Sequence, residues 1–240
     1  MNENPRHTSP VRSVRLIAFD ADDTLWDNQS HFARVERAYC DILAPFSDAH
    51  EVSAALFSTE SDNMPLLGYG CKAFTISLVE TAVRISEGRV PATDILRIVN
   101  LGKELLSLPA TPLPHVADTL RGLRDTGRYQ LAVFTKGELL DQRNKLERSG
   151  LGPLFDDIVV VADKTQAEYR RLCHFFEVDA GETLMVGNSF KSDVEPMLRL
   201  GGWAAHIPFH TTWQHEETEE YDHQRLFKLH DIKDVLTLMR

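Results

Sequence analysis

The hydrophobic and polar positions of this chain follow two different rhythms, which divide it into two kinds of region. Near the start, residues 14–19 (VRLIAF) form a short apolar run that stops at a group of charged residues. A short, apolar, β-rich run of this kind predicts a buried strand. The chain leaves this strand through a cluster of carboxylates at Asp20, Asp22, Asp23 and Asp27.

The region from residue 28 to residue 108 has helical periodicity. Residues 71–86 and 93–107 carry apolar side chains at three- and four-residue spacing, and two shorter helices are predicted over 30–44 and 49–60. No convincing strand appears in this region. The pattern therefore predicts an all-helical insert after the first strand.

Prolines at positions 109, 112 and 114 end the helical region and predict a hinge or linker. Beyond them, short apolar runs alternate with helical segments. This alternation predicts βαβ units, and hence an α/β fold with a parallel sheet. The predicted strands cover 130–134, 158–161, 183–186 and 203–207, and a last strand and helix follow from residue 225. The predicted helices cover 115–125, 138–149, 165–177 and 193–200.

The composition narrows the possible classes of function. The chain has 240 residues, of which 42% are hydrophobic and 26% charged, which is typical of a globular protein. The net charge of -10 disfavours a nucleic-acid partner, because phosphate backbones are bound by basic surfaces. A phosphorylated small molecule stays possible, since local lysines and a cation can outweigh the global charge.

The termini and cysteines bear on location. No run is long enough to cross a bilayer, and residues 1–12 are polar and predicted to be a disordered lead-in. Cys40, Cys71 and Cys173 are scattered without CxxC spacing, so neither a disulfide framework nor a zinc site is indicated. We therefore expect a cytoplasmic monomer or homodimer with no membrane partner.

The ends of the predicted strands are the expected place for chemistry, because ligands of open parallel sheets bind at the carboxyl ends. Asp20 and Asp22 lie two residues apart, so their side chains point to the same side of an extended backbone. One carboxylate could attack an electrophile while the other moves a proton, and Mg²⁺ bound there would neutralise a phosphate ester. A helix-capping or turn role would account for one of these aspartates, but it accounts poorly for a cluster of them.

The other three strand ends carry weaker signals. Thr135, followed by Lys136 and a glycine, could cradle a phosphate at a helix entrance or could cap that helix. Lys164 could neutralise a nucleophile and a phosphoryl group, or it could be a solvated surface lysine. Asn188 and Asp193 could ligate a hard cation, or they could form a turn and a helix cap. The convergence of four strand ends on one sheet edge favours a shared site.

These segments resemble the four motifs of the haloacid dehalogenase-like (HAD) hydrolase superfamily, in order and spacing, across residues 12–208. The segment DADDT resembles the first motif (DxDxT), LAVFTKG the second, Lys164 the third and VGNSFKSD the fourth. The resemblance implies a Rossmann-like, doubly wound parallel sheet with a helical cap of type C1. The catalytic core would comprise residues 12–27 and 109–240, and the cap would comprise residues 28–108.

The resemblance also implies a phosphoaspartyl mechanism. Asp20 would attack phosphorus, and Asp22 would protonate the leaving group and then activate water. Thr135 and Lys164 would hold the phosphoryl oxygens. Mg²⁺ would be bound by the carboxylates of Asp20 and Asp193 and by the backbone carbonyl of Asp22.

One position departs from the family pattern, because Asn188 stands where an aspartate is usual. Its amide oxygen can still reach Mg²⁺ directly or through water, but one negative charge is lost. We therefore expect weaker metal affinity, with Asp193 carrying the charge. The same feature raises a 2-haloacid dehalogenase as an alternative, because such enzymes lack the acidic pair.

The leading hypothesis is a Mg²⁺-dependent phosphatase of a small phosphorylated metabolite. Asp22 favours it, because cleavage of a phosphate ester needs an acid for the leaving oxygen. A halide leaves without protonation, and dehalogenases of this fold lack the second aspartate. A non-catalytic binding protein would be expected to have lost a catalytic residue, and none is lost. A phosphotransferase or mutase uses the same motifs and stays open.

Substrate selectivity is expected to lie in the cap, where Tyr69 could stack on a ring and Lys72 could meet a carboxylate or second phosphate. The alternatives are cap packing for Tyr69 and a solvated helix start for Lys72. Near the C-terminus, the segment from His206 to Asp222 is predicted to be a surface loop. In it we expect Trp213 to pack locally and the acidic run 216–222 to be solvated.

Overall fold

The computed structural model describes residues 10–239 and contains a six-stranded parallel sheet. The strand order is β3-β2-β1-β4-β5-β6, so the chain winds outward from β1 in one direction and then in the other. The predicted Rossmann-like, doubly wound α/β fold is thereby confirmed. The strands are β1 Leu16–Phe19, β2 Gln130–Lys136, β3 Asp157–Val161, β4 Thr183–Gly187, β5 Trp203–His206 and β6 Leu226–Lys228.

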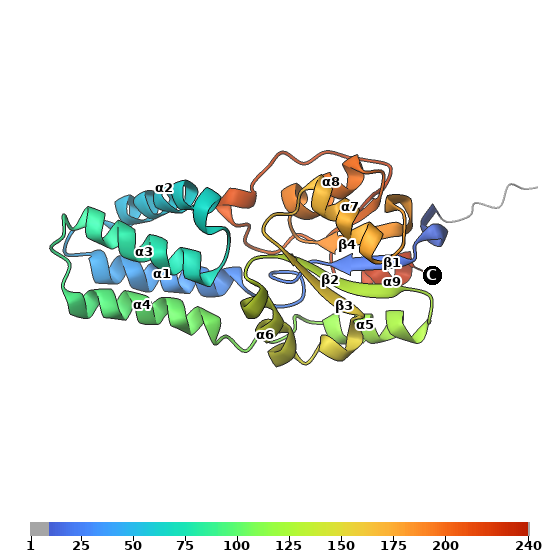
Figure 1. The fold of residues 1–240 in the computed structure, drawn as a ribbon, viewed down its shortest axis with the longest axis horizontal. Coiled ribbons are helices and arrows are strands. Elements are labelled where there is room, and N and C mark those ends of the chain that lie inside the picture. The colour runs from blue at the N-terminus through green and yellow to red at the C-terminus, as the bar shows by residue number, and fades with distance from the viewer. Residues whose placement is uncertain (1–9, 240) are drawn as a thin grey trace, which may run out of the picture.

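Helices cover both faces of the sheet (Figure 1). In β1, Ile17 and Phe19 join the hydrophobic cluster on one face, and Leu16 and Ala18 join the cluster on the other. A central parallel strand is buried on both faces, which is why this segment is apolar without interruption. The first face is covered by α5 Val116–Asp125, α6 Leu139–Ser149 and α9 Asp234–Leu238. The second face is covered by α7 Gln166–Phe175 and α8 Glu195–Arg199.

Four helices follow β1 and pack around a hydrophobic cluster of their own. They lie together at one end of the molecule, away from the sheet (Figure 1). The separate cluster supports the predicted cap at residues 28–108, whose boundaries stay a prediction. The four helices are α1 Gln29–Leu43, α2 Ala49–Leu67, α3 Cys71–Ile85 and α4 Ala92–Leu106.

The chain leaves the core and returns to it through two segments that lie side by side. The backbone N–H of Leu113 donates to the Leu25 carbonyl at 2.9 Å, and Trp26 forms a β-bridge with Pro112. The predicted proline-rich linker therefore pairs with the exit from the aspartate cluster. Any movement of the four helices against the sheet would pass through these two paired segments.

Two boundaries differ from the sequence prediction. Residues 1–9 of the predicted disordered lead-in lie outside the described residues, but Pro10–Ser13 forms a 3₁₀ helix. The prediction was wrong for these last residues because Val11 is buried in the core, at 3% exposure. Helix α2 continues past its predicted end at Glu60, because Pro65 lies in the last turn, where it removes only one helical hydrogen bond. Within residues 10–239, no helix is long and apolar enough to span a membrane.

Candidate active site

A cavity of about 190 Å³ opens at the carboxyl ends of β3, β2, β1 and β4, which are adjacent in the sheet. It extends from these strand ends into the space among α1, α2 and α3. The four predicted strand ends therefore meet in one place, as expected from the topology. Predicted site residues that line the cavity are Asp20, Asp22, Tyr69, Thr135, Lys136, Lys164, Asn188 and Asp193.

At the base of the cavity, Lys164 lies between two buried carboxylates. Its Nζ donates to Asp20 Oδ1 at 2.5 Å and to Asp193 Oδ1 at 2.6 Å, and all three residues are buried. Burial raises the pKa of Asp20 to about 7, with the Asp193 carboxylate adding to the effect and Lys164 opposing it. The pKa of Lys164 stays above its ordinary value despite burial, because of the same two carboxylates. With both carboxylates ionised, the cluster carries a net negative charge, which suits a cation.

The position of Asp193 depends on Gly187, the last residue of β4. A Cβ atom built on Gly187 would lie 2.2 Å from Asp193 Oδ2, far inside van der Waals contact. That oxygen accepts from the backbone N–H of Ser189 at 2.9 Å. Asp193 itself lies in a π-helical turn, Phe190–Val194, so the helix predicted to start at this residue begins earlier. Glycine is therefore required here for space and not for an unusual φ.

The residues around Asn188 fit a hard cation. The terminal amide atom of Asn188 that faces the site lies 3.1 Å from Thr24 Oγ1, 3.2 Å from Asp20 Oδ2 and 3.3 Å from the Asp22 carbonyl oxygen. Because these neighbours include hydrogen-bond acceptors, the atom that faces them in the absence of a cation is the amide nitrogen. Rotation of the amide by half a turn would present its oxygen to a bound cation. Neighbouring ligands of octahedral Mg²⁺ stand roughly 2.9 Å apart, which is close to these spacings.

Within the described residues, no three His, Cys, Asp or Glu side chains converge on a metal position. A Mg²⁺ ion would therefore depend on the amide oxygen of Asn188 and the backbone carbonyl of Asp22, together with the Asp20 carboxylate. Asp193 has both carboxylate oxygens engaged, by Lys164 and by the Ser189 N–H. The chemistry of this donor set, all hard oxygens, fits Mg²⁺ better than a softer metal.

Asp22 is held by three donors. Trp26 Nε1 donates to Oδ1 at 2.7 Å, Gln142 Nε2 donates to Oδ2 at 2.8 Å, and Lys145 Nζ lies 3.0 and 3.1 Å from the two oxygens. Burial alone would raise the pKa of Asp22, but Lys145 and the hydrogen bonds together lower it below its ordinary value. The ionised carboxylate is thus the stable form in this arrangement.

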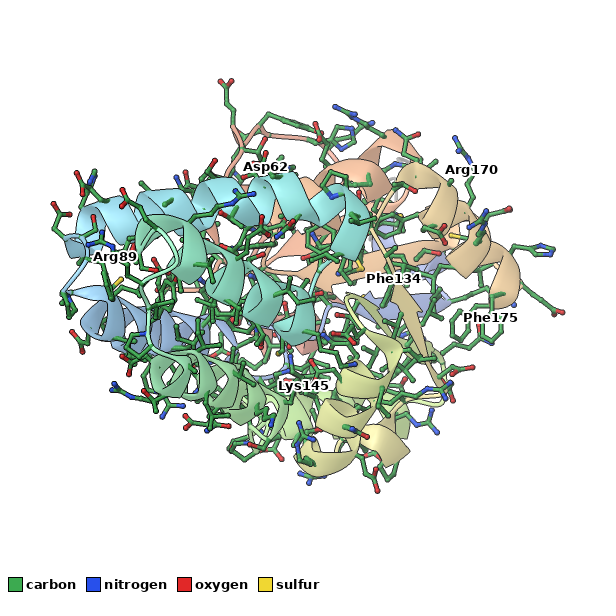
Figure 2. All side chains as sticks on the ribbon, turned by 60° about the vertical axis from the view of Figure 1, so that its left-hand side comes forward. Asp62, Arg89, Phe134, Lys145, Arg170 and Phe175 are labelled. Carbon is green, nitrogen blue, oxygen red and sulfur yellow. The ribbon has the colours of Figure 1, made fainter. Side chains whose placement is uncertain are left out.

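Lys145 and its neighbours are functional candidates that the sequence did not reveal. Asp141, Gln142 and Lys145 are all buried on one face of α6, and the Lys145 Nζ also lies 3.5 Å from Asp141 Oδ2. Figure 2 shows Lys145 on α6 where that helix meets the cap helices. An aspartate and a lysine four residues apart usually form a solvated helical ion pair. Only their burial beneath the cap marks them as part of the site.

Thr135 is buried in the wall of the cavity, and Lys136 next to it is not free to move. The Lys136 ammonium forms an ion pair with Glu216, lies 3.0 Å from Ser192 Oγ and stands 4.3 Å from the centre of the Tyr69 ring. The prediction that Glu216 is solvated was wrong, because its carboxylate also accepts from the hydroxyls of Ser189 and Ser192. Burial would raise the pKa of Glu216, but Lys136 and these hydroxyls lower it.

The segment between β5 and β6 reaches from the core to the cap helices (Figure 1, where it is coloured red near α2). Trp213 packs edge-on against Tyr69 with ring centres 5.9 Å apart, and His215 stacks on Phe57 of α2 at 4.2 Å. Trp213 also packs locally, as predicted, against His215 with ring centres 4.7 Å apart, but the prediction missed its contact with the cap. Aromatic contacts with the cap order this segment and bring Glu216 to the cavity.

The two predicted selectivity residues separate in the structure. Tyr69 lines the cavity, between Lys136 and Trp213. Lys72 lies outside the lining and forms an exposed ion pair with Glu138 at the start of α6. A direct substrate contact for Lys72 stays a prediction, and its exposed ion pair matches the alternative, a solvated helix start.

A family model of haloacid dehalogenase-like hydrolases matches residues 14–201 of the chain. The chain belongs to this family. Among solved structures, a haloacid dehalogenase-like hydrolase from Xanthomonas campestris is 33% identical, with a TM-score of 0.85 over 94% of this chain and 90% of that one. L-2-haloacid dehalogenase from Xanthobacter autotrophicus, at 17% identity, has a TM-score of 0.64 over 94% of this chain and 98% of its own, which shows a shared fold.

Two curated proteins with named activities are also similar to this chain. A glyceraldehyde 3-phosphate phosphatase of Methanocaldococcus jannaschii is 26% identical over 93% of this chain and 97% of its own length. The pyrimidine 5'-nucleotidase YjjG of Escherichia coli is 27% identical over 85% of this chain and 88% of its own. Their similarity extends through both the sheet and the cap helices.

Proposed function

We propose that this protein is a Mg²⁺-dependent phosphatase that hydrolyses a small phosphorylated metabolite through an aspartyl-phosphate on Asp20. The observation that carries the proposal is the placing of two carboxylates, Asp20 and Asp22, in one cavity with different partners. Asp20 lies against Lys164 beside the cation-compatible oxygens, and Asp22 lies against Lys145. Paired carboxylates in distinct environments are suited to a nucleophile and an acid/base.

In this proposal Asp20 attacks phosphorus, and Thr135 and Lys164 hold the phosphoryl oxygens. Bound Mg²⁺ would neutralise the phosphoryl charge, held by Asp20, the Asp22 carbonyl and Asn188, with Asp193 fixed beside them. Lys164 keeps its charge in the buried site and so can stabilise negative charge that develops on phosphorus. Lys136, bound to Glu216, borders the same space and is a further candidate for the phosphoryl group.

Asp22 is the proposed acid and base. Its three donors stabilise the carboxylate, which is the form that accepts a proton from the attacking water. In the preceding step it donates a proton to the leaving oxygen, and because the free site favours the carboxylate, Asp22 must take up that proton when the substrate is bound. Halide departure needs no such proton, so a dehalogenase would have no use for this arrangement.

The named relatives support the same reaction class. Both the glyceraldehyde 3-phosphate phosphatase and the pyrimidine 5'-nucleotidase cleave phosphate monoesters, as their names state. We infer the same class for this chain, with the substrate itself left to experiment. The three cysteines are unpaired and buried, which supports the expected cytoplasmic location.

The test is hydrolysis of p-nitrophenyl phosphate with Mg²⁺, with EDTA in place of Mg²⁺, and with the Asp20→Asn variant. We expect activity only in the first case. The matched control is Asp62→Asn, because Asp62 is an exposed aspartate of α2 outside the cavity and should leave the rate unchanged. Equal rates in all preparations, or turnover of 2-haloacids without turnover of any phosphate ester, would contradict the proposal.

A further inference from the structure

The positive charges of the cavity are confined to its core end and are already neutralised. Among the described residues that line it, the cationic side chains are Lys136, Lys145 and Lys164. Each forms an ion pair with one or two carboxylates of the protein. One phosphoryl group with its cation can be accommodated there, but no lysine or arginine of the described lining is left for a second anionic group of a substrate.

The cap end of the cavity has the opposite character. Glu36 and Glu60 line it, together with an aromatic pair, Phe32 and Phe74, whose ring centres are 5.0 Å apart. Glu36 accepts one hydrogen bond, from the Ser53 hydroxyl at 2.6 Å. Within residues 10–239 the Glu60 carboxyl has no hydrogen-bond or ion-pair partner, and burial together with Glu36 raises the pKa of Glu60 to about 7.

A second, independent observation lies in the wall between the two ends. Asp141 and Gln142 line the cavity and are 5% and 3% exposed. Asp141 Oδ1 and Gln142 Oε1 are buried and have no hydrogen-bond partner among the described residues. Buried acceptors without donors are costly and mark places where a ligand or water completes the hydrogen bonding. These two buried positions in the wall are both acceptors, and they call for donors.

We propose that the substrate is a phosphate monoester whose alcohol part carries no second negative charge and offers hydrogen-bond donors to Glu36 and Glu60. This inference rests on the proposed phosphatase function. The donors can be hydroxyl groups or an ammonium group, packed between Phe32 and Phe74. A carboxylate or second phosphate in this position would meet Glu36 and Glu60 with no cationic side chain of the described lining beside them, so carboxylated phosphate esters and bisphosphates are excluded as good substrates.

The test uses alkyl phosphates of matched length, from two to five carbons, ending in an ammonium, a hydroxyl or a carboxylate group. We expect the kcat/KM of the carboxylate ester to be at least about tenfold below that of the hydroxyl ester at the best chain length. The ammonium arm shows whether a cation or a neutral donor is preferred, and the proposal requires either one to exceed the carboxylate.

Glu60→Gln and Glu36→Gln should each raise the carboxylate-to-hydroxyl ratio of kcat/KM several-fold, mainly through KM. The matched control is Glu104→Gln, an exposed glutamate of α4 outside the cavity, which should leave the ratio unchanged. A carboxylate ester that is hydrolysed as well as the hydroxyl ester would overturn the proposal. A ratio that both cavity variants leave unchanged would overturn it equally.

Binding of the same three esters to Asp20→Asn, measured by calorimetry, separates this inference from the proposed function. If the hydroxyl or ammonium ester binds best but the wild-type protein hydrolyses none of them and no aryl phosphate, the phosphatase proposal fails and the cap inference stands. If aryl phosphate is hydrolysed in a Mg²⁺- and Asp20-dependent manner but the carboxylate ester binds best, the cap inference fails and the function stands.

Discussion

The buried carboxyl groups at the two ends of the cavity differ in whether the protein supplies them with partners. At the core end, Lys164 separates Asp20 from Asp193, and every carboxylate near it has a cationic partner or a hydrogen-bond donor. At the cap end, Glu60 is left without a partner within the described residues and holds its proton to a higher pH. The core end therefore holds all the groups that the proposed reaction needs except the cation. At the cap end, hydrogen-bond donors of the substrate would supply the missing partners.

This difference indicates that the core end performs the reaction and that the cap end selects the substrate. Residues at the strand ends are fixed by the sheet and by mutual ion pairs, so their arrangement can serve many related substrates. Residues of the cap end come from separate helices, α1, α2 and α3, and no cationic side chain of the described lining lies among them. Changes at the core end should alter the rate with every substrate, and changes at the cap end should alter the ranking of substrates.

The largest effect is expected for Lys164→Met at the core end. This change leaves Asp20 and Asp193 buried without their shared cation, which should destabilise the fold by about 3–5 kcal/mol. Activity should fall by at least ~10³-fold, since the phosphoryl group also loses a contact. Chemical denaturation and aryl phosphate hydrolysis measure the two effects.

A second substitution separates the structural from the catalytic part of this effect. Adding Asp193→Asn to Lys164→Met removes one of the two unpaired charges and should recover part of the stability without recovering activity. Full activity in the single variant would contradict the role of Lys164, and an unchanged stability would show that its charge is not needed to balance the two carboxylates.

Gly187→Ala is expected to have the next largest effect, because a Cβ at this position would overlap the Asp193 carboxylate. The displaced carboxylate can no longer hold Lys164 and the cation site in place, so activity should fall by about 10- to 100-fold, with a higher Mg²⁺ requirement. The control is Gly152→Ala, where a Cβ would meet nothing within 4 Å. Equal effects of the two substitutions would contradict the space argument.

Lys145→Met tests the environment of Asp22. Lys145 lowers the pKa of Asp22, so its removal should raise that pKa and move the acidic limb of the pH–kcat profile to higher pH. We expect a loss of about tenfold in kcat near neutral pH. Lys72→Met removes a lysine from an exposed ion pair and is the matched control. A profile that stays in place with Lys145→Met would show that the contact does not tune Asp22.

The smallest effect is expected at the cap end, for stability in the absence of substrate. The pKa of Glu60 is raised from 4.5 to about 7 in the folded state. Its contribution is therefore fully present below the unfolded pKa and is lost as the pH rises through about 7. Glu60→Gln should stabilise the protein by roughly 1–3 kcal/mol at pH 8 and change little at pH 5. Thermal unfolding at both pH values measures this, and destabilisation at pH 8 would contradict an unpartnered carboxylate.

Much of the core end could be predicted from sequence, because it depends on where strands stop. Asp20, Thr135, Lys164 and Asn188 follow apolar runs whose length and spacing identify parallel strands, and the topology brings those ends together. The fold class followed from the same alternation. These features are local, so one segment of sequence is enough to reveal each of them.

The remaining residues could not be predicted, because their roles arise from packing between distant segments. Lys145 resembles a surface lysine until the cap covers α6, and Glu216 resembles one member of a solvated acidic run. Glu216 lies at the cavity in a segment whose Trp213 and His215 contact Tyr69 and Phe57 of the cap. The ion pair of Lys72 with Glu138, outside the cavity, is likewise a contact between distant segments.

Trapping of the covalent intermediate tests the central claim most directly. The protein is mixed with aryl phosphate and Mg²⁺, quenched in acid during turnover, and digested for mass spectrometry. We predict one phosphoryl group on the peptide that contains Asp20, and none after EDTA treatment or in Asp20→Asn. Continued hydrolysis without a labelled peptide, or a phosphoryl group on another residue, would contradict Asp20 as the nucleophile.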